Sequence, residues 1–313
     1  MKFEPAKISK VIEQNYSYLM PDFYEMQIEY ISAMNNIYKD LDTALIDMFL
    51  TNKLYQSENK EIYKASHSKF KINEISKAIG VPRETVRRKK IKLTKNKFII
   101  LNKNKKSFHI NANLINKKVF EPQIKISSKM LSNYCNFFSN KDVFNKDLDL
   151  VSFKNNIKKK FTLYLPILLN FQISYFTNWR KFMDMECIYI ALLCALNTST
   201  QLKRKSSNNN EIFDSNEIFD KILKLSDKFG LNSTSIAEIT KIPRTTVLRK
   251  LVILQKLNML KKDKFKRYET ESFVVSDNSR KTLYPYLQNT IKLLGLLISE
   301  CLEIYSSKEL KII

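Results

Sequence analysis

Apolar side chains recur at helical spacing through much of the chain, which predicts amphipathic helices from about residue 16 to residue 53. The core stripe of this region consists of Leu41, Leu45, Ile46, Met48 and Phe49. Residues 54–70 are polar and lack a strong period, so we predict a loop there. A further helix is expected over 72–79, ended by Gly80, which can adopt a left-handed backbone.

A third helix is predicted to start at Pro82, because the first turn of a helix does not need the missing N–H. Its apolar residues are expected to face inward: Val86, Ile91 and Leu93. Its outer face would carry the residues that are costly to bury: Arg83, Glu84, Arg87, Arg88 and Lys90. Two short strands over 98–101 and 107–110 should follow, with a polar tip at 102–106.

The second half of the chain repeats this order. Helices are predicted over about 183–196, 234–240 and 243–257, and a hairpin over 259–262 and 265–270. Lys241 stands where Gly80 stands in the first half, which weakens the match slightly. The segment 206–221 contains NEIFD twice, and we expect a low-complexity surface insertion there.

Two short segments align without gaps: ISKAIGVPRETVRRK (75–89) and IAEITKIPRTTVLRK (236–250). Their prolines are 243 − 82 = 161 residues apart. Pro122 and Pro285 follow the two hairpins at a similar offset, and each is expected to open a helix. A Tyr-Leu pair near a proline precedes each copy. The sequence therefore predicts a duplicated unit of about 150 residues. The expected domains are 1–150 and 151–313.

Composition agrees with a mostly α fold, because 44% of the 313 residues are hydrophobic and only three are glycine. The formal net charge of +23 favours DNA, RNA or an anionic membrane surface as a partner. An AT-rich genome would explain part of this excess, since Lys, Asn and Ile are abundant, so charge alone does not choose among them. The uncharged stretch 161–179 contains Pro166, Asn170, Gln172 and Asn178, which favours a buried helix over a membrane span.

No catalytic or metal-binding pattern is apparent. The four cysteines form no CxxC pair, and there are only two histidines, so a zinc site is not expected. Cys187 and Cys194 lie in an apolar helix and are expected to be buried thiols. Without a phosphate loop, nucleophile elbow or triad, we expect no enzyme activity and no cofactor. The lack of a secretory signal at the N-terminus favours a reducing cytoplasm.

The segment GVPRETVRRK resembles the recognition-helix region of bacterial winged helix-turn-helix regulators. It is especially similar to the Arg-Glu-Thr-Val-x-Arg string of the cyclic-AMP receptor protein family. The resemblance covers about 45 residues in each half and none of that family's effector domain, so no small-molecule effector is evident. It implies a fold of two tandem winged helix-turn-helix units. It also implies base contacts by Arg83, Glu84, Arg88, Arg244 and Arg249.

The expected partner is therefore double-stranded DNA. Arg83 and Arg244 lie at the start of the two recognition helices, where an arginine can donate two hydrogen bonds to guanine. Glu84 could accept from cytosine, whereas Thr245 replaces it in the second copy. We therefore predict two non-identical half-sites, arranged as an imperfect inverted or direct repeat.

Further contacts are expected around each recognition helix. Thr85 and Thr246 either donate to phosphate or bond to their own helix, and the sequence does not choose between these. Arg87 belongs to the outer face of the first helix. The two wings carry basic residues suited to phosphate or the minor groove: Lys103, Lys105 and Lys106, and Lys262, Lys264, Lys266 and Arg267.

The last helix carries an apolar seam with alternating spacings of four and three residues. Its members are Leu287, Ile291, Leu294, Ile298, Cys301 and Tyr305. We expect the seam to pack within the chain against the helix over about 123–138, because the duplication already supplies a pseudo-dimer. A homodimer formed through this helix is the alternative.

Three functions remain open from the sequence. The leading hypothesis is a sequence-specific transcriptional regulator whose units occupy adjacent major grooves about 34 Å apart. The second is a replication initiator of plasmid or phage type with two winged-helix units. The third is an adaptor that binds RNA, protein or nucleic acid without sequence preference, which a steep salt dependence without specificity would indicate.

Overall fold

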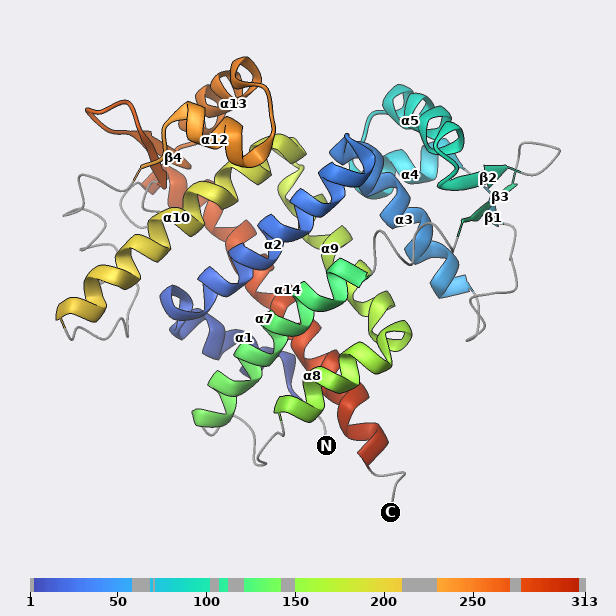
Figure 1. The fold of residues 1–313 in the computed structure, drawn as a ribbon, viewed down its shortest axis with the longest axis horizontal. Helices are drawn as coiled ribbons and strands as arrows, with labels where there is room; N and C mark the ends of the chain where they lie inside the picture. Colours follow the sequence, from blue (N-terminus) through green and yellow to red (C-terminus); the bar gives the residue numbers. More distant parts are fainter. Residues whose placement is uncertain are drawn as a thin grey trace.

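The computed structural model describes residues 3–57, 68–69, 71–101, 107–111, 121–141, 150–209, 230–270 and 277–309. Within these residues the protein is mostly helical with small antiparallel sheets, as predicted (Figure 1). The first half contains α1 (Pro5–Gln14), α2 (Tyr16–Tyr38), α3 (Leu41–Ser57), β1 (Ser68–Lys69), α4 (Ile72–Ile79), α5 (Arg83–Lys95), β2 (Ile99–Leu101), β3 (Ser107–Ile110) and α7 (Glu121–Asn140). The second half contains α8 (Leu150–Lys159), α9 (Phe161–Trp179), α10 (Met185–Asn209), α12 (Ser233–Thr240), α13 (Arg244–Lys256), β4 (Leu260–Lys262), β5 (Tyr268–Thr270) and α14 (Asp277–Glu309).

The order of elements in the first half recurs in the second. The hairpin of β2 and β3 has its counterpart in β4 and β5, and the strand registers correspond: Ile99 faces Ile110 as Leu260 faces Thr270. The short strand β1 pairs with β3, and in the second half a single bridge from Leu231 to Tyr268 takes its place. The repeat thus extends well beyond the aligned segments.

The two halves exchange helices. Helix α1 packs against α14, and α8 packs in the same way against α7. Helix α2 packs against α10, and α9 packs against α3. These four contacts form two reciprocal pairs, which is the property of an interface with two-fold symmetry. The halves are related by an approximate two-fold axis within one chain.

The core lies where the exchanged helices meet. Phe23 of α2 makes edge-to-face contacts with Phe171 and Tyr175 of α9, at centroid distances of 6.2 and 5.3 Å. Gly295 lets α14 approach α1 closely, because a Cβ there would lie 2.7 Å from the carbonyl oxygen of Pro5. The guanidinium of Arg180, at the end of α9, donates to Asp42 of α3 at 2.6 Å. Aromatic packing, the close approach of α14 to α1 and an ion pair therefore all connect the two halves.

Helix α9 is the uncharged segment for which we predicted a buried helix. Gln172 and Asn178 are buried in it, and the amide of Asn178 donates to the carbonyl of Tyr286 at 3.1 Å. Asn170 is exposed but accepts a hydrogen bond from Asn52 at 2.8 Å. None of the helices in the described ranges has the length and apolar character needed to cross a membrane.

Several sequence predictions are wrong in detail. Ile91 is 65% exposed rather than facing inward. Pro285 lies inside α14 rather than opening it, whereas Pro122 does lie in the first turn of α7. Part of the loop predicted over 54–70 is ordered, since α3 continues to Ser57 and β1 forms at 68–69. Residues 102–106 and 210–221 lie outside the described residues, and 206–209 belong to the end of α10.

The seam of α14 is buried within the chain, but its partner was predicted wrongly. All six of its residues are buried: Leu287, Ile291, Leu294, Ile298, Cys301 and Tyr305. Helix α14 packs chiefly against α1 and α9 rather than against α7. The helix exchange explains the difference, because it brings the first helix of one half onto the last helix of the other.

One buried carboxyl makes stability depend on pH. Asp47 is buried, one of its oxygens accepts a hydrogen bond from Tyr38, and the other has no hydrogen-bond partner. Burial raises the pKa of Asp47 to about 7, above its usual value near 4. The folded chain therefore holds this proton at a pH where the unfolded chain has lost it.

We expect the free energy of unfolding to fall by about 2 to 3 kcal/mol between roughly pH 5 and pH 8, because a proton held only by the folded state stabilises it less as pH rises. The Asp47→Asn variant is neutral at every pH and should lose this part of the slope. Urea denaturation across that range measures it. If the free energy of unfolding depends on pH equally in the variant and in the native chain, Asp47 is not the group responsible.

Candidate nucleic-acid interface

Each half contains two helices joined by a tight turn of the same geometry. The turn residues Gly80 and Lys241 have left-handed backbones, with φ of 66° and 58°. Pro82 and Pro243 directly precede α5 and α13 with nearly equal torsion angles, φ −55° and ψ 140° against φ −53° and ψ 135°. Lys241 therefore keeps the turn despite lacking the freedom of glycine, and its Cβ adds strain of about 1 kcal/mol.

A lysine anchors each of these helices to the body of the protein. Lys89 forms an ion pair with Asp40, and its counterpart Lys250 pairs with Asp184. Asp40 also accepts from the backbone N–H of Thr43 at the start of α3, and Asp184 caps α10 in the same way. Burial opposes ionisation of both carboxyls, yet the lysine hydrogen bonds lower the pKa of each below its usual value. These two lysines of the repeated motif are therefore structural.

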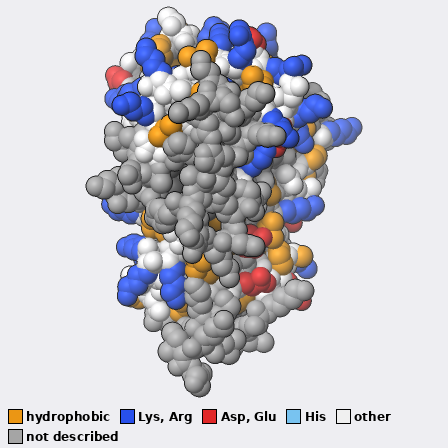
Figure 2. All heavy atoms as spheres, turned by 90° about the vertical axis from the view of Figure 1, so that its right-hand side faces the viewer, with side chains coloured by type: hydrophobic (Ala, Val, Ile, Leu, Met, Phe, Trp, Pro, Cys, Tyr) orange, Lys and Arg blue, Asp and Glu red, His pale blue; other side chains and the backbone are white. Residues whose placement is uncertain are grey.

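The outward face of both helices carries the predicted recognition residues. Arg83, Glu84 and Arg88 on α5 and Arg244, Thr245 and Arg249 on α13 are all exposed. Helices α5 and α13 lie along the same edge of the molecule, at the top of Figure 1. Figure 2, which faces the side of α5, shows many Lys and Arg side chains gathered around this upper end. The structure thus brings both sets of predicted residues to one side of the protein.

The two outward faces differ in charge pairing. The guanidinium of Arg87 donates from Nε and Nη2 to the two carboxylate oxygens of Glu84, both at 2.9 Å. This hydrogen bonding lowers the pKa of Glu84. The corresponding positions on α13 are Thr245 and Leu248, which cannot form such a pair. The divergence therefore involves two positions on the helix, where the sequence comparison had singled out only one.

An apolar residue continues each outward face. Ile91 is 65% exposed, and its counterpart Val252 is 51% exposed. On α5, Ile91 follows Arg83 and Arg87 at four-residue spacing, so the three share one face. The sequence signal was a β-branched residue at the same place in both copies. We had assigned Ile91 to the core because it is apolar. Thr85 and Thr246 are half-buried at the edge of this face.

The hairpin of β4 and β5 has a basic tip that is held by several hydrogen bonds. Asp263 accepts hydrogen bonds at 2.8 Å from the backbone N–H groups of Phe265 and Arg267 and from the side chain of Arg267. Phe265 is 54% exposed, and the cations of Lys264 and Arg267 lie 5.4 and 4.8 Å from its ring centroid. The predicted contacts Lys262, Lys264 and Lys266 are exposed, whereas Arg267 is half-buried.

The first hairpin is described only in its strands. Its predicted contacts Lys103, Lys105 and Lys106 lie outside the described residues. Phe265 in the second hairpin was missed by the sequence analysis, although an aromatic residue between lysines at a turn is a recognisable signal. It adds an exposed ring to the basic tip.

No cluster of three or more potential metal-ligating side chains occurs within the described residues. The four cysteines are buried and free. Comparison with known proteins adds no relative, because no family model, no curated protein and no solved structure matches the chain.

Proposed function

We propose that the chain binds double-stranded DNA in a sequence-specific manner, through two winged helix-turn-helix units that act as a covalent pseudo-dimer. The observation that carries this proposal is the presence of two equivalent helices, α5 and α13, that expose arginines on one edge of a strongly basic protein. Arginines at the start of a helix can reach guanine edges in the major groove. The basic tip of the β4–β5 hairpin is suited to contact the phosphate backbone beside the groove.

The helix exchange favours an inverted over a direct repeat. The reciprocal packing of α1 with α14 and of α8 with α7 relates the halves by an approximate two-fold axis. Two-fold symmetric proteins bind sites with the same symmetry, because each recognition helix then meets its half-site in an equivalent way. The sites should lie about one helical turn apart, which is about 34 Å. An adaptor without sequence preference, the third hypothesis, would not require two equivalent helices related by such symmetry.

Selection of bound sequences from random DNA tests the proposal. We expect an enriched imperfect inverted repeat, and an affinity that also falls with added salt because Lys and Arg displace counterions from the phosphates. Steep salt dependence without any enriched sequence would instead support the adaptor. A role in transcription is proposed as the use of this activity. Binding sites clustered at a replication origin would favour the initiator.

The difference between the two recognition faces gives a further prediction. Exchanging Glu84 for Thr should make the first helix resemble the second at this position, so the selected half-sites should become more alike at one base pair. A wrong base at such a contact costs about 1 to 3 kcal/mol. The Thr245→Glu variant is the matched control, and it should shift the second half-site toward the first. Unchanged half-sites in both variants would contradict the base-reading role.

A further inference from the structure

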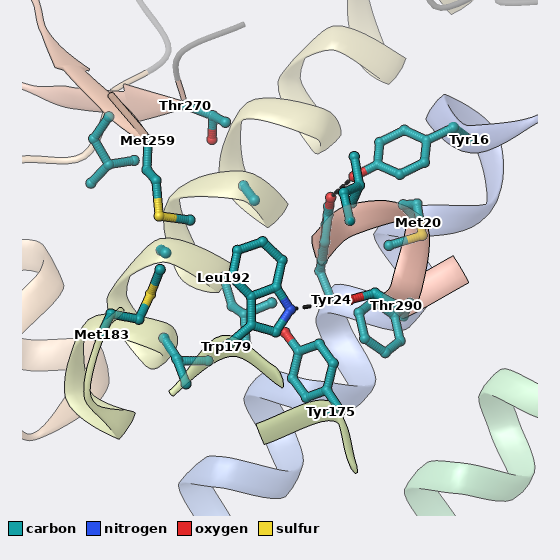
Figure 3. Close-up of a pocket in the computed structure, with 16 residues that line it drawn as sticks. Tyr16, Met20, Tyr24, Tyr175, Trp179, Met183, Leu192, Met259, Thr270 and Thr290 are labelled. Atoms are coloured by element: carbon teal, nitrogen blue, oxygen red, sulfur yellow. Dashed lines mark hydrogen bonds between the residues drawn. The ribbon is translucent and has the colours of Figure 1, made fainter. Parts of the chain in front are cut away.

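A pocket lies between α2 of the first half and five elements of the second half. Its void is about 60 Å³, and it is bounded by α2, α9, α10, the strands β4 and β5, and α14 (Figure 3). The lining side chains are mostly apolar or aromatic, and Trp179, Tyr24 and Met259 are among them. A void of this size exceeds what one water molecule needs, and apolar cavities of this kind bind small organic molecules.

The first half fills the corresponding position. Phe98 and Met259 are counterparts, since the backbone N–H of each bonds to the carbonyl five residues earlier, Leu93 and Leu254, at 3.0 Å. The ring of Phe98 stacks on Tyr38 with a centroid distance of 4.4 Å. In the second half, the side chain of Met259 takes the place of this ring and lines the pocket. The two copies thus differ at a position in the pocket wall.

A second difference places a polar group in this space. Thr270 occupies the register position that Ile110 occupies in the first hairpin. Its side-chain oxygen is buried and has no hydrogen-bond partner, although its backbone N–H donates to Thr198 at 3.4 Å. A buried hydroxyl without a partner costs free energy, which a bound molecule would recover by hydrogen bonding to it. Two pairs of polar groups in the wall bond to each other: Tyr16 with Tyr24 at 2.5 Å, and Trp179 with Thr290 at 3.1 Å.

We infer that this pocket binds a small neutral molecule with an apolar, preferably aromatic, body and one hydrogen-bonding group directed at Thr270. None of the described residues that line the pocket is charged, which favours a neutral ligand, because an ion would be desolvated there without a counter-charge from them. A ring needs more room than the present void. Met20, Met183 and Met259 line the pocket, and their flexible side chains can move to admit it. This inference does not depend on DNA binding.

The single tryptophan of the chain supplies a direct measurement. Trp179 lines the pocket, so 4-bromophenol bound there should quench its fluorescence through the heavy bromine atom, with a saturable dependence on concentration. The melting temperature of the full-length protein should rise with 4-bromophenol in parallel, because a ligand that binds only the folded state stabilises it. Quenching that grows linearly without saturation, with no change in melting temperature, would overturn the inference.

Two variants make the test specific. Met259→Phe installs the residue of the first half and should abolish saturable quenching while the helical circular dichroism is retained. Thr270→Val removes the hydroxyl at nearly constant volume and should weaken binding about threefold to tenfold, the contribution of one hydrogen bond. If the saturable quenching by 4-bromophenol is unchanged in Met259→Phe, the ligand binds elsewhere and the proposed binding site is wrong. If Met259→Phe fails to fold, the Thr270→Val variant still tests the site. Undiminished binding of 4-bromophenol by that variant would overturn the proposed hydrogen bond to Thr270.

Discussion

Replacing Arg83 and Arg244 with alanine should lower the affinity for the selected DNA site by at least about 30-fold, while binding to unrelated DNA persists. Each arginine can make a bidentate contact to guanine that is worth about 1 to 3 kcal/mol of discrimination. Both side chains are exposed at the start of their helices, so their removal should leave the fold intact. Gel-shift titration with specific and unrelated duplexes at equal salt measures the two affinities.

The control for this double variant removes the same charge from a different place. Arg204 lies late in α10 and Lys158 lies in α8, and both are exposed. The variant with both of them changed to alanine should keep its preference for the selected site. If the two double variants lose specificity equally, general electrostatic attraction explains the binding, and the assignment of α5 and α13 as recognition helices is wrong.

The second large effect concerns the stability of α14. Leu294 is fully buried in this helix, and changing it to alanine should lower the free energy of unfolding by about 2 to 5 kcal/mol. Leu296, two residues later, is 43% exposed, and its change to alanine should cost no more than about 0.5 kcal/mol. Guanidinium denaturation of the two variants gives the comparison.

Removing residues 286–313 should prevent folding, because the seam of α14 covers α1 and α9 inside the same chain. A shortened chain that stays folded and differs only by becoming a monomer would mean that the helix serves association between chains. Sedimentation and circular dichroism together separate these outcomes. A folded monomer would also contradict the expected cost of Leu294→Ala.

Local signals in the sequence predicted local structure well. The helix over 72–79 has the predicted bounds, and the left-handed turn at Gly80 follows from its lack of a side chain. The ion pair between Glu84 and Arg87 was also available from the sequence, since their spacing brings the two side chains together on a helix. Spacing along one helix is sufficient for predictions of this kind.

Predictions that depend on distant parts of the chain were less successful. An apolar stripe shows that a helix face is buried, but it does not identify the partner, so α14 was assigned to α7 instead of α1 and α9. Lys250 looks like any other basic residue until Asp184, 66 positions away, is brought beside it by the fold. Ile91 was assigned to the core because hydrophobicity alone cannot distinguish a buried residue from one exposed on the outer face of a helix.

The exchange of helices has a consequence for how the protein is made. Helix α1 leaves the ribosome well before its main partner α14, because the elements from α2 to β5 lie between them in the chain. The hydroxyl of Ser299 in α14 donates to the carbonyl of Phe3, a contact between residues 296 positions apart. The apolar face of α1 therefore stays without its partner until α14 has been synthesised, and contacts of such long range slow folding. The two halves can therefore assemble fully only after α14 has left the ribosome, and the nascent chain should be a substrate for chaperones until then.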